Sequence, residues 1–327
     1  MQPKRFAIYA WFVLVFTLLV VLWGAFVRAT GSGAGCGNHW PLCNGVVVPR
    51  APQMETMIEF SHRLSSGLNL LLVLGLIIWG FRLYGRGHPI RRGLLGAGLF
   101  IIMEALIGAG LVLFGLTADN DSRARAISMA LHLVNTFLLM AALAYTAWLA
   151  SGQSAPRFRG QGLAGVGWWV GLAGVVFVGM SGAITALGDT LYPSRSLAEA
   201  LAADLSPASH LFIRLRMLHP AVTLTVGSAL IAAGLLARRQ VSGEGGPSTA
   251  AQGPGSEALA SPRRWGTAVA ALSLTELAVG IANLLLLAPV WMQLIHLLIA
   301  DLLWISYVLL GATLLGSGAS PARRVSA

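Results

Sequence analysis

The sequence predicts an all-α integral membrane protein with eight transmembrane helices, which form two pseudo-symmetric halves of four helices each. Its 327 residues are 56% hydrophobic and only 10% charged, and their mean hydropathy is +0.74. A soluble core of this size cannot bury so much apolar surface. Long apolar runs recur along the whole chain, and short motifs of one half return in the other. These observations make lipid the solvent of the fold.

Eight apolar runs are long enough to cross a bilayer, which takes roughly 20 helical residues. They cover residues 7–27, 57–83, 94–116, 126–150, 165–187, 211–237, 265–287 and 290–315. The first run follows Lys4 and Arg5, as the core of a signal peptide would. At about 21 residues it exceeds the usual signal core of about 7 to 15, so we interpret it as a retained span.

The basic residues indicate the orientation of these spans. With the N-terminus in the cytoplasm, 14 of the 22 basic residues lie inside: Lys4, Arg5, Arg82, Arg86, Arg91, Arg92, Arg157, Arg159, Arg238, Arg239, Arg263, Arg264, Arg323 and Arg324. The positive-inside rule favours this topology, and an even number of spans returns the C-terminus to the cytoplasm. The arginines form small groups and no basic stripe, so the net charge of +10 does not indicate nucleic-acid binding.

The chain divides into residues 1–155 and 156–327, joined near residues 151–160. Glu104 and Gly108 in the third span correspond to Glu276 and Gly280 in the seventh, and a His-Leu pair follows each in the next span. A weak internal duplication explains this pattern, as in other membrane folds built from repeats. Residues 243–261 are rich in Gly, Ser, Pro and Ala and predict a flexible cytoplasmic loop without an assigned function.

Four of the seven histidines fall inside predicted spans, one on each even-numbered helix: His62, His132, His219 and His296. Each follows the start of its helix by about 5 to 8 residues, so the four share a layer roughly 8 to 12 Å below the outer surface. One intramembrane histidine often only hydrogen-bonds a neighbouring helix, but four in register favour a common role. A solvated side chain is the default for His39, His88 and His210.

Two imidazoles that face each other across a bundle can ligate haem iron from opposite sides. A structural zinc site more often uses four ligands that include thiolates. We therefore expect one haem-sized site in each half, formed by His62 with His132 and by His219 with His296.

Glu59 precedes His62 by three residues, so helical spacing puts both side chains on one face. An acid in the first turn of a helix complements the macrodipole, and this explanation needs no function. Alternatively, a carboxylate near a haem edge can take a proton or stabilise a developing positive charge. Interhelical hydrogen bonding explains three further acids inside predicted spans, Glu104, Glu276 and Asp301, about as well as a function does.

Cys36 and Cys43 both fall between the first two spans, in a loop that the topology places outside the membrane. An oxidising compartment favours a disulfide between them. Their spacing differs from the Cys-x-x-Cys of redox and zinc motifs, so metal binding is disfavoured. A structural bridge is favoured over one that passes electrons, and the second role stays open.

Taken together, several stretches resemble the haem A synthase family over nearly the whole chain. They are residues 24–45 (GAFVRATGSGAGCGNHWPLCNG), 59–63 (EFSHR), 132–135 (HLVN), 218–220 (LHP) and 296–298 (HLL). The Glu-x-x-His-Arg motif together with the Cys-x-x-x-Trp-Pro-x-Cys loop is the specific part of this resemblance.

The resemblance implies an eight-helix enzyme of a bacterial cell membrane, an oxidoreductase that oxidises the carbon-8 methyl group of haem O to the formyl group of haem A for terminal oxidase assembly. It implies that His219 and His296 ligate a haem b cofactor, that His62 and His132 line the substrate haem site, and that Glu59 is catalytic. A haem O synthase and an electron donor are the implied partners. Some relatives carry a second cysteine pair in a later outer loop, but residues 189–214 contain none.

Two other functions compete with this one. A di-haem membrane cytochrome that transfers electrons from quinol would also use two bis-histidine sites, but it would stack its haems across the membrane and not in one layer. A transporter is disfavoured because no predicted helix is broken at mid-membrane.

Overall fold

The computed structural model describes residues 2–157, 160–240 and 261–317, and these contain helices and no β-strand. Eight of the helices are long and apolar enough to cross a membrane, which confirms the predicted fold class. The long helices are α1 (Gln2–Ala29), α2 (Met54–Leu83), α3 (Ile90–Leu113), α4 (Arg123–Ala150), α5 (Gly162–Leu191), α8 (Leu218–Gln240), α10 (Pro262–Leu285) and α11 (Val290–Ser317). The short elements are η1 (Ser32–Ala34), α6 (Leu197–Leu205) and α7 (Leu211–Leu215).

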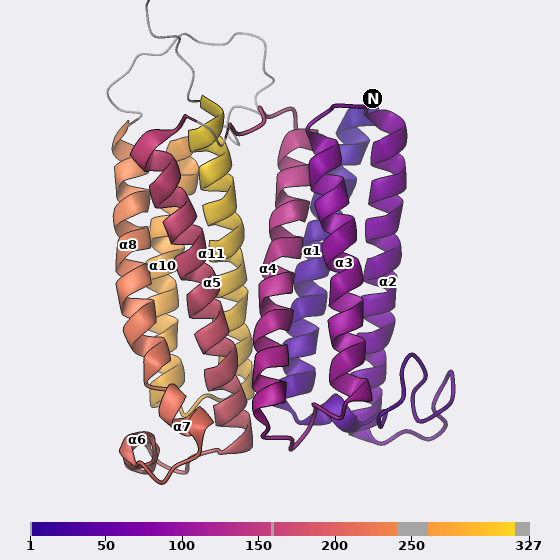
Figure 1. Ribbon diagram of the computed structural model, residues 1–327, viewed down its shortest axis with the longest axis vertical. Coiled ribbons are helices and arrows are strands. Elements are labelled where there is room, and N and C mark those ends of the chain that lie inside the picture. Colours follow the sequence, from indigo (N-terminus) through magenta and orange to yellow (C-terminus); the bar gives the residue numbers. More distant parts are fainter. Residues whose placement is uncertain (1, 158–159, 241–260, 318–327) are drawn as a thin grey trace, which may run out of the picture.

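The long helices lie side by side and nearly parallel to one axis (Figure 1). Loop 30–53 and helices α6 and α7 lie at one end of the bundle, and the N-terminus lies at the other. Large apolar side chains cover the outside, among them Ile8, Leu71, Phe114 and Leu163. Such a surface is unfavourable in water and favourable in lipid, so the protein is a multi-pass membrane protein.

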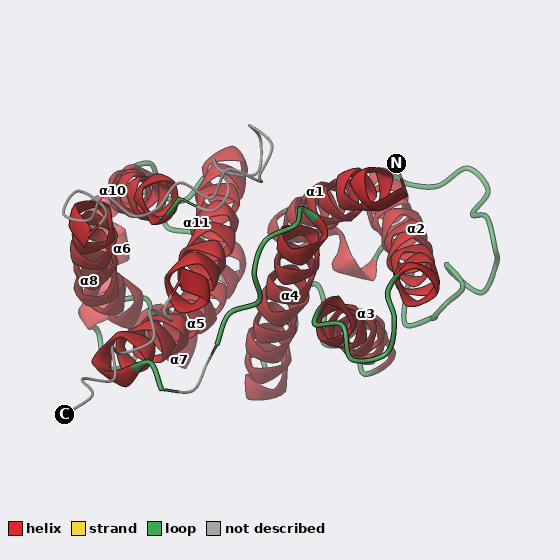
Figure 2. Cartoon of the chain, turned by 90° about the horizontal axis from the view of Figure 1, so that it is seen from above, coloured by secondary structure: helices red, strands yellow, loops and turns green. Residues whose placement is uncertain are grey.

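Seen from above, the helices form two groups (Figure 2). Helices α1 to α4 make up the N-terminal group, and α5, α8, α10 and α11 make up the C-terminal group. The groups meet where α1 and α4 pack against α5 and α11. At this contact the Phe137 ring stacks on Trp304 at 4.9 Å between centroids, and the Trp304 indole donates to the Phe137 carbonyl at 2.7 Å. The duplication and the boundary at residue 155 stay predictions.

Most of the predicted bounds differ from the observed helix ends by a few residues. Helix α2 begins at Met54 and not at residue 57. Helix α3 ends at Leu113 and not at residue 116, because Gly115 follows with a φ of 62°, the left-handed conformation that closes many helices.

The span predicted at residues 211–237 is interrupted near its start, a break that was not predicted, while the expectation of no break at mid-membrane is unaffected. Helix α7 ends at Leu215 and α8 begins at Leu218. Pro220 explains the break, because its ring has no N–H and clashes with the carbonyl four residues earlier, that of Arg216. The interruption lies in the first turns of the span, and α8 is continuous after it.

Several predictions fall on residues outside the described ranges. They concern the loop at 243–261 apart from Ser261, the basic residues Arg159, Arg323 and Arg324, and the cytoplasmic C-terminus.

Candidate paired-histidine sites and the disulfide loop

The four intramembrane histidines lie on the four helices that the sequence predicted: α2, α4, α8 and α11. His219 and His296 face each other with 6.3 Å between ring centroids and 77° between ring planes. His62 interacts electrostatically with His132, so these two also lie close together. The structure therefore brings the side chains together in the predicted pairs, one pair in each helix group.

Each imidazole of the C-terminal pair has its Nδ1 atom beside a polar neighbour, and for His219 the two form a hydrogen bond. The Nδ1 atom of His219 lies 3.0 Å from the Ser181 hydroxyl on α5. The Nδ1 atom of His296 lies 3.1 Å from a Glu276 carboxylate oxygen on α10. Holding Nδ1 sets the ring orientation and leaves Nε2 for a ligand, as partners of metal-bound histidines commonly do.

The N-terminal pair is held less symmetrically. His132 has its Nδ1 atom 3.5 Å from Glu104 on α3. Glu104 also accepts hydrogen bonds from the Asn135 amide at 2.5 Å and the Thr136 hydroxyl at 2.6 Å. The Nδ1 atoms of His62 and His132 are both buried without a hydrogen-bond partner among the described residues. The orientation of these two rings therefore depends on what binds beside them.

Glycines let three of the imidazoles approach helices α1, α5 and α10 closely. A Cβ atom on Gly24 of α1 would lie 2.9 Å from Cε1 of His62, and one on Gly182 of α5 would lie 3.1 Å from Cε1 of His219. Gly280 of α10 stands in the same relation to His296, at 3.3 Å. A side chain at these positions would push the ring away, so each glycine keeps its histidine in place.

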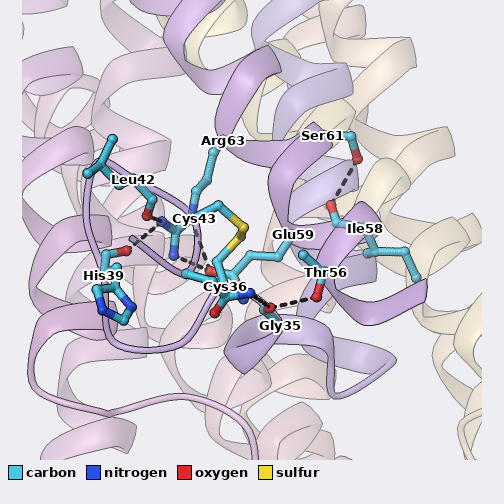
Figure 3. Close-up of a disulfide and its surroundings, with 11 residues drawn as sticks. Gly35, Cys36, His39, Leu42, Cys43, Thr56, Ile58, Glu59, Ser61 and Arg63 are labelled. Carbon is cyan, nitrogen blue, oxygen red and sulfur yellow. Dashed lines mark hydrogen bonds and ion pairs between the residues drawn. A yellow bond between two sulfur atoms is a disulfide. The ribbon is translucent and has the colours of Figure 1, made fainter. Parts of the chain in front are cut away.

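Glu59 is 4% exposed, and both of its carboxylate oxygens are engaged (Figure 3). One oxygen pairs with the Arg63 guanidinium at 2.5 Å, and the other accepts the backbone N–H of Cys36 at 2.8 Å. Glu59 therefore connects the histidine-bearing helix α2 to the cysteine loop. Because α2 begins at Met54, the premise that Glu59 occupies its first turn is wrong, and Glu55 is the acid of that turn.

The predicted disulfide between Cys36 and Cys43 is present, and both sulfur-bearing side chains are buried (Figure 3). Arg63 donates to the carbonyls of His39 and Leu42, on the stretch that the bridge closes, at 2.6 and 2.7 Å. The loop is thus fastened to α2 by a covalent bridge and by polar contacts that converge on the Glu59–Arg63 pair.

Three residues before His219 the C-terminal group carries Arg216, whose charge is opposite to that of Glu59 before His62. Arg216 is 9% exposed, and it pairs with Asp189 at 3.0 Å and with Asp204 at 2.8 Å. Sequence reasoning missed this cluster, because Asp189 and Asp204 are brought to Arg216 only by the turn through α6 and α7.

From the sequence, neither Glu104 nor Glu276 was predicted to orient a histidine. The pattern that could have predicted it is their equivalent position before the two His-Leu pairs. The predicted interhelical hydrogen bonding is confirmed for Glu104, but the prediction is wrong for Asp301. Asp301 is fully buried, and neither of its oxygens has a hydrogen-bond partner in the described part of the chain.

The residues present fit an iron porphyrin. Two metal–nitrogen bonds of about 2 Å plus two ring radii separate the centroids of a bis-histidine pair by roughly 6 Å, and the 6.3 Å between His219 and His296 agrees with this spacing. Ser181 is hydrogen-bonded to Nδ1 of His219, Glu276 lies 3.1 Å from Nδ1 of His296, and the pair lies among apolar helices. His219 and His296 are therefore the residues that could hold a haem b iron.

The fold and these sites define the class of the protein as a polytopic helical membrane protein with two paired-histidine sites. Residues 7–308 match the family described as cytochrome oxidase assembly protein. With the heme A synthase relatives described next, this match shows that the chain belongs to the haem A synthase family.

Relatives with known names agree at the family level and differ in detail. A protoheme IX farnesyltransferase of Thermus thermophilus is 50% identical over 97% of this chain, and the match covers 49% of that protein. The heme A synthase of Alkalihalophilus pseudofirmus is 43% identical over 34% of this chain and 38% of its own length. That of Shouchella clausii is 43% identical over 43% and 44%. The chain thus spans about half the length of the Thermus relative and less of the others.

Proposed function

We propose that the chain is a haem A synthase, which oxidises the carbon-8 methyl group of haem O to the formyl group of haem A for terminal oxidase assembly. The observation that carries the proposal is the pair of facing histidine sites on one membrane bundle. A haem-to-haem oxidation needs one porphyrin as substrate and a second as redox partner, and two such sites supply a place for each.

In this proposal His219 and His296 bind haem b, which supplies one-electron redox chemistry when bound. The substrate haem O binds between His62 and His132, where neither Nδ1 atom has a hydrogen-bond partner in the described ranges and His132 lies 3.5 Å from Glu104, which leaves a looser site. A loosely held site suits a group that must enter and leave. The firmly oriented C-terminal pair suits a resident cofactor.

The oxidation proceeds from methyl to alcohol and then to a hydrated aldehyde, which loses water to give the formyl group. Each of the two oxidations takes one oxygen atom from water and releases two electrons and two protons, so an external acceptor must take four electrons per product. The chain's own contribution is to orient the porphyrin and hold a base near its edge. Glu59, one turn from His62 on α2, is the residue we propose for that base.

The contacts of Glu59 bear on this role. Its ion pair with Arg63 and its bond to the Cys36 N–H fix the direction of the carboxylate. A buried carboxylate held in this way can stabilise positive charge that develops at a reacting carbon. The same contacts connect it to the disulfide, so Glu59 serves both the loop and the proposed chemistry.

A second candidate is the transfer of a farnesyl group to protohaem IX, because the Thermus relative carries that name. The match covers only 49% of the relative, so half of that protein lies outside it and can account for the name. We propose instead that a separate haem O synthase activity supplies the farnesylated substrate and that an electron donor or acceptor protein completes the cycle.

We further propose a bacterial plasma membrane location with cytoplasmic N- and C-termini. Loop 30–53 and helices α6 and α7 lie at one end of the bundle (Figure 1). That end is the oxidising side in this orientation, which agrees with the disulfide of loop 30–53. The basic residues predicted to be cytoplasmic then flank the other end.

The deciding experiment gives membranes that contain the chain either haem O, or protohaem with farnesyl diphosphate, and identifies the extracted haems by mass. Haem A from haem O supports the synthase. Haem O from protohaem and farnesyl diphosphate would select the transferase. Unchanged haem in both incubations, with a bis-histidine spectrum retained, would favour an electron-transferring di-haem cytochrome.

The role of Glu59 is tested with E59A and E59Q. We expect E59A to abolish haem A formation while haem b stays bound. E59Q keeps an oxygen for the Cys36 N–H but loses the negative charge, and we expect it to be inactive with the loop intact. Normal haem A formation by E59Q would remove Glu59 from the mechanism.

A further inference from the structure

Two arginines at the outer end of the N-terminal site have no carboxylate within ion-pair distance in the described ranges. Arg125, in the first turn of α4, is 3% exposed, and Arg28, in the last turn of α1, is partly buried. The described ion pairs of arginine involve only Arg63 and Arg216. Buried charges are normally paired, so two unpaired guanidinium groups indicate a missing anion.

Helical spacing places both arginines just outside the layer of His62 and His132. Arg28 follows Gly24 by four residues, and Gly24 faces the His62 ring. Arg125 precedes His132 by seven residues, which is two helical turns and roughly 10 Å on the same face of α4. The two guanidinium groups are near enough to interact electrostatically.

The acceptors that Arg28 does have are all neutral. It donates to the Ala186 carbonyl, the Thr190 hydroxyl and the Gln293 amide oxygen, each at 2.9 Å. Ala186 and Thr190 are on α5 and Gln293 is on α11, so Arg28 crosses from the N-terminal to the C-terminal group. Asp189 interacts with Arg28 at longer range, but it already pairs with Arg216.

Arg125 is likewise bonded only to neutral groups. It donates to the carbonyls of Ala118 and Asn120, and its Nε atom is buried without a hydrogen-bond partner among the residues described. Asp119 interacts with it electrostatically, but that side chain is exposed. A donor therefore remains available on a charged side chain that is shielded from water.

We propose that Arg125 binds a propionate carboxylate of the haem in the His62–His132 site. This rests on the proposed function, which places a haem there. Guanidinium groups recognise carboxylates by charge-assisted, often bidentate hydrogen bonds. Anchoring the propionate edge at the outer end removes the rotational freedom of the porphyrin, so Arg125 acts as a positioning residue that determines which methyl group meets the oxidising machinery.

The test compares two ligands that differ only in the proposed contact, haem O and its dimethyl ester. Each is titrated into the purified full-length chain that carries its resident haem, and binding is followed by the Soret difference spectrum. We expect the wild type to bind the free acid at least about tenfold more tightly than the ester, because charged hydrogen bonds contribute at least that much. R125Q should bind both ligands equally, and R125K should restore part of the preference.

R123Q is the matched control, since Arg123 is exposed in the same turn of α4. It should keep the wild-type preference. The proposal is overturned if the wild type binds acid and ester equally, or if R125Q keeps the preference. An Arg125 that only fastened residues 118–120 would weaken both ligands alike.

Failure of the proposed function gives a different result. In that case the wild type binds neither haem O nor its ester, or H132A leaves binding of both unchanged. A regiospecificity readout completes the test, because R125Q should yield porphyrins oxidised at methyl groups other than that on carbon 8.

Discussion

The two helix groups carry their histidines in the same way but surround them differently. Three residues before the histidine stands Glu59 in one group and Arg216 in the other. In the N-terminal group, Glu104 lies on the helix before that of His132 and accepts hydrogen bonds from Asn135 and Thr136. The C-terminal group has Ile299 and Ala300 at the corresponding positions, and Asp301 follows.

This difference teaches that the framework fixes where a porphyrin can bind, while the neighbouring polar residues decide what the site does with it. The C-terminal pair is closely spaced, the Nδ1 atom of His219 is hydrogen-bonded to Ser181, and that of His296 lies 3.1 Å from Glu276. In the N-terminal pair neither Nδ1 atom has a hydrogen-bond partner in the described ranges, and the disulfide loop and the buried Arg125 lie toward its outer end. The surroundings of the C-terminal pair favour retention of a bound haem, and those of the N-terminal pair favour the exchange and turnover of one.

The largest expected effect is on haem content, which histidine variants of the two groups should change in different ways. H219A and H296A should each lose the resident haem entirely, because one imidazole cannot replace a bis-histidine set. H62A and H132A should keep it and lose only binding of added haem O. Visible spectra of the purified variants measure both outcomes. Resident pigment that survives H219A and disappears in H62A would reverse the assignment of the two sites.

The next effect concerns the charge before each histidine. R216A leaves Asp189 and Asp204 as buried carboxylates without their cation, and breaking a buried pair in this way costs about 3–5 kcal/mol. Thermal unfolding in detergent should therefore show a large drop in Tm. R214A is the control, because Arg214 is exposed two residues earlier and should unfold as the wild type does. Equal Tm values for the two variants would contradict the structural role of the Arg216 cluster.

Much of this comparison could be predicted from the sequence, because hydropathy and histidine spacing are local patterns. The eight spans and the disulfide followed from composition and topology. The contacts of Arg216 could not be predicted, because they depend on how Pro220 breaks the helix and how α6 folds back. The roles of Glu104 and Glu276 were within reach from their repetition, but only packing shows that each carboxylate faces the next histidine.

A smaller effect should distinguish the acids of the two groups. In E104Q the amide oxygen can accept only one of the two bonds that Glu104 takes from Asn135 and Thr136, and the amide nitrogen cannot accept the other, so about 1–3 kcal/mol should be lost. D301N removes a buried acid that has no partner in the described ranges, and should be neutral or mildly stabilising. Thermal unfolding of both variants checks the contrast. A strong destabilisation by D301N would reveal a partner for Asp301 that these contacts do not include.

The smallest effect concerns the contact between the groups. Five residues after the histidine, α4 carries Phe137 where α11 carries Asp301, and Phe137 stacks on Trp304. W304F keeps an aromatic ring there but loses the indole bond to the Phe137 carbonyl, a cost of about 0.5–1.5 kcal/mol.

W304L should cost more than W304F, because the aromatic pair contributes about 0.5–1.5 kcal/mol beyond its buried area. W291F is the control on the same helix, since Trp291 is 55% exposed. If the stack holds the groups in register, W304L should also slow electron transfer between added haem O and the resident haem, while W291F should not. Unchanged transfer in W304L would mean that the helix backbones alone maintain the distance between the two histidine pairs, and that the asymmetry of the groups is chemical and not mechanical.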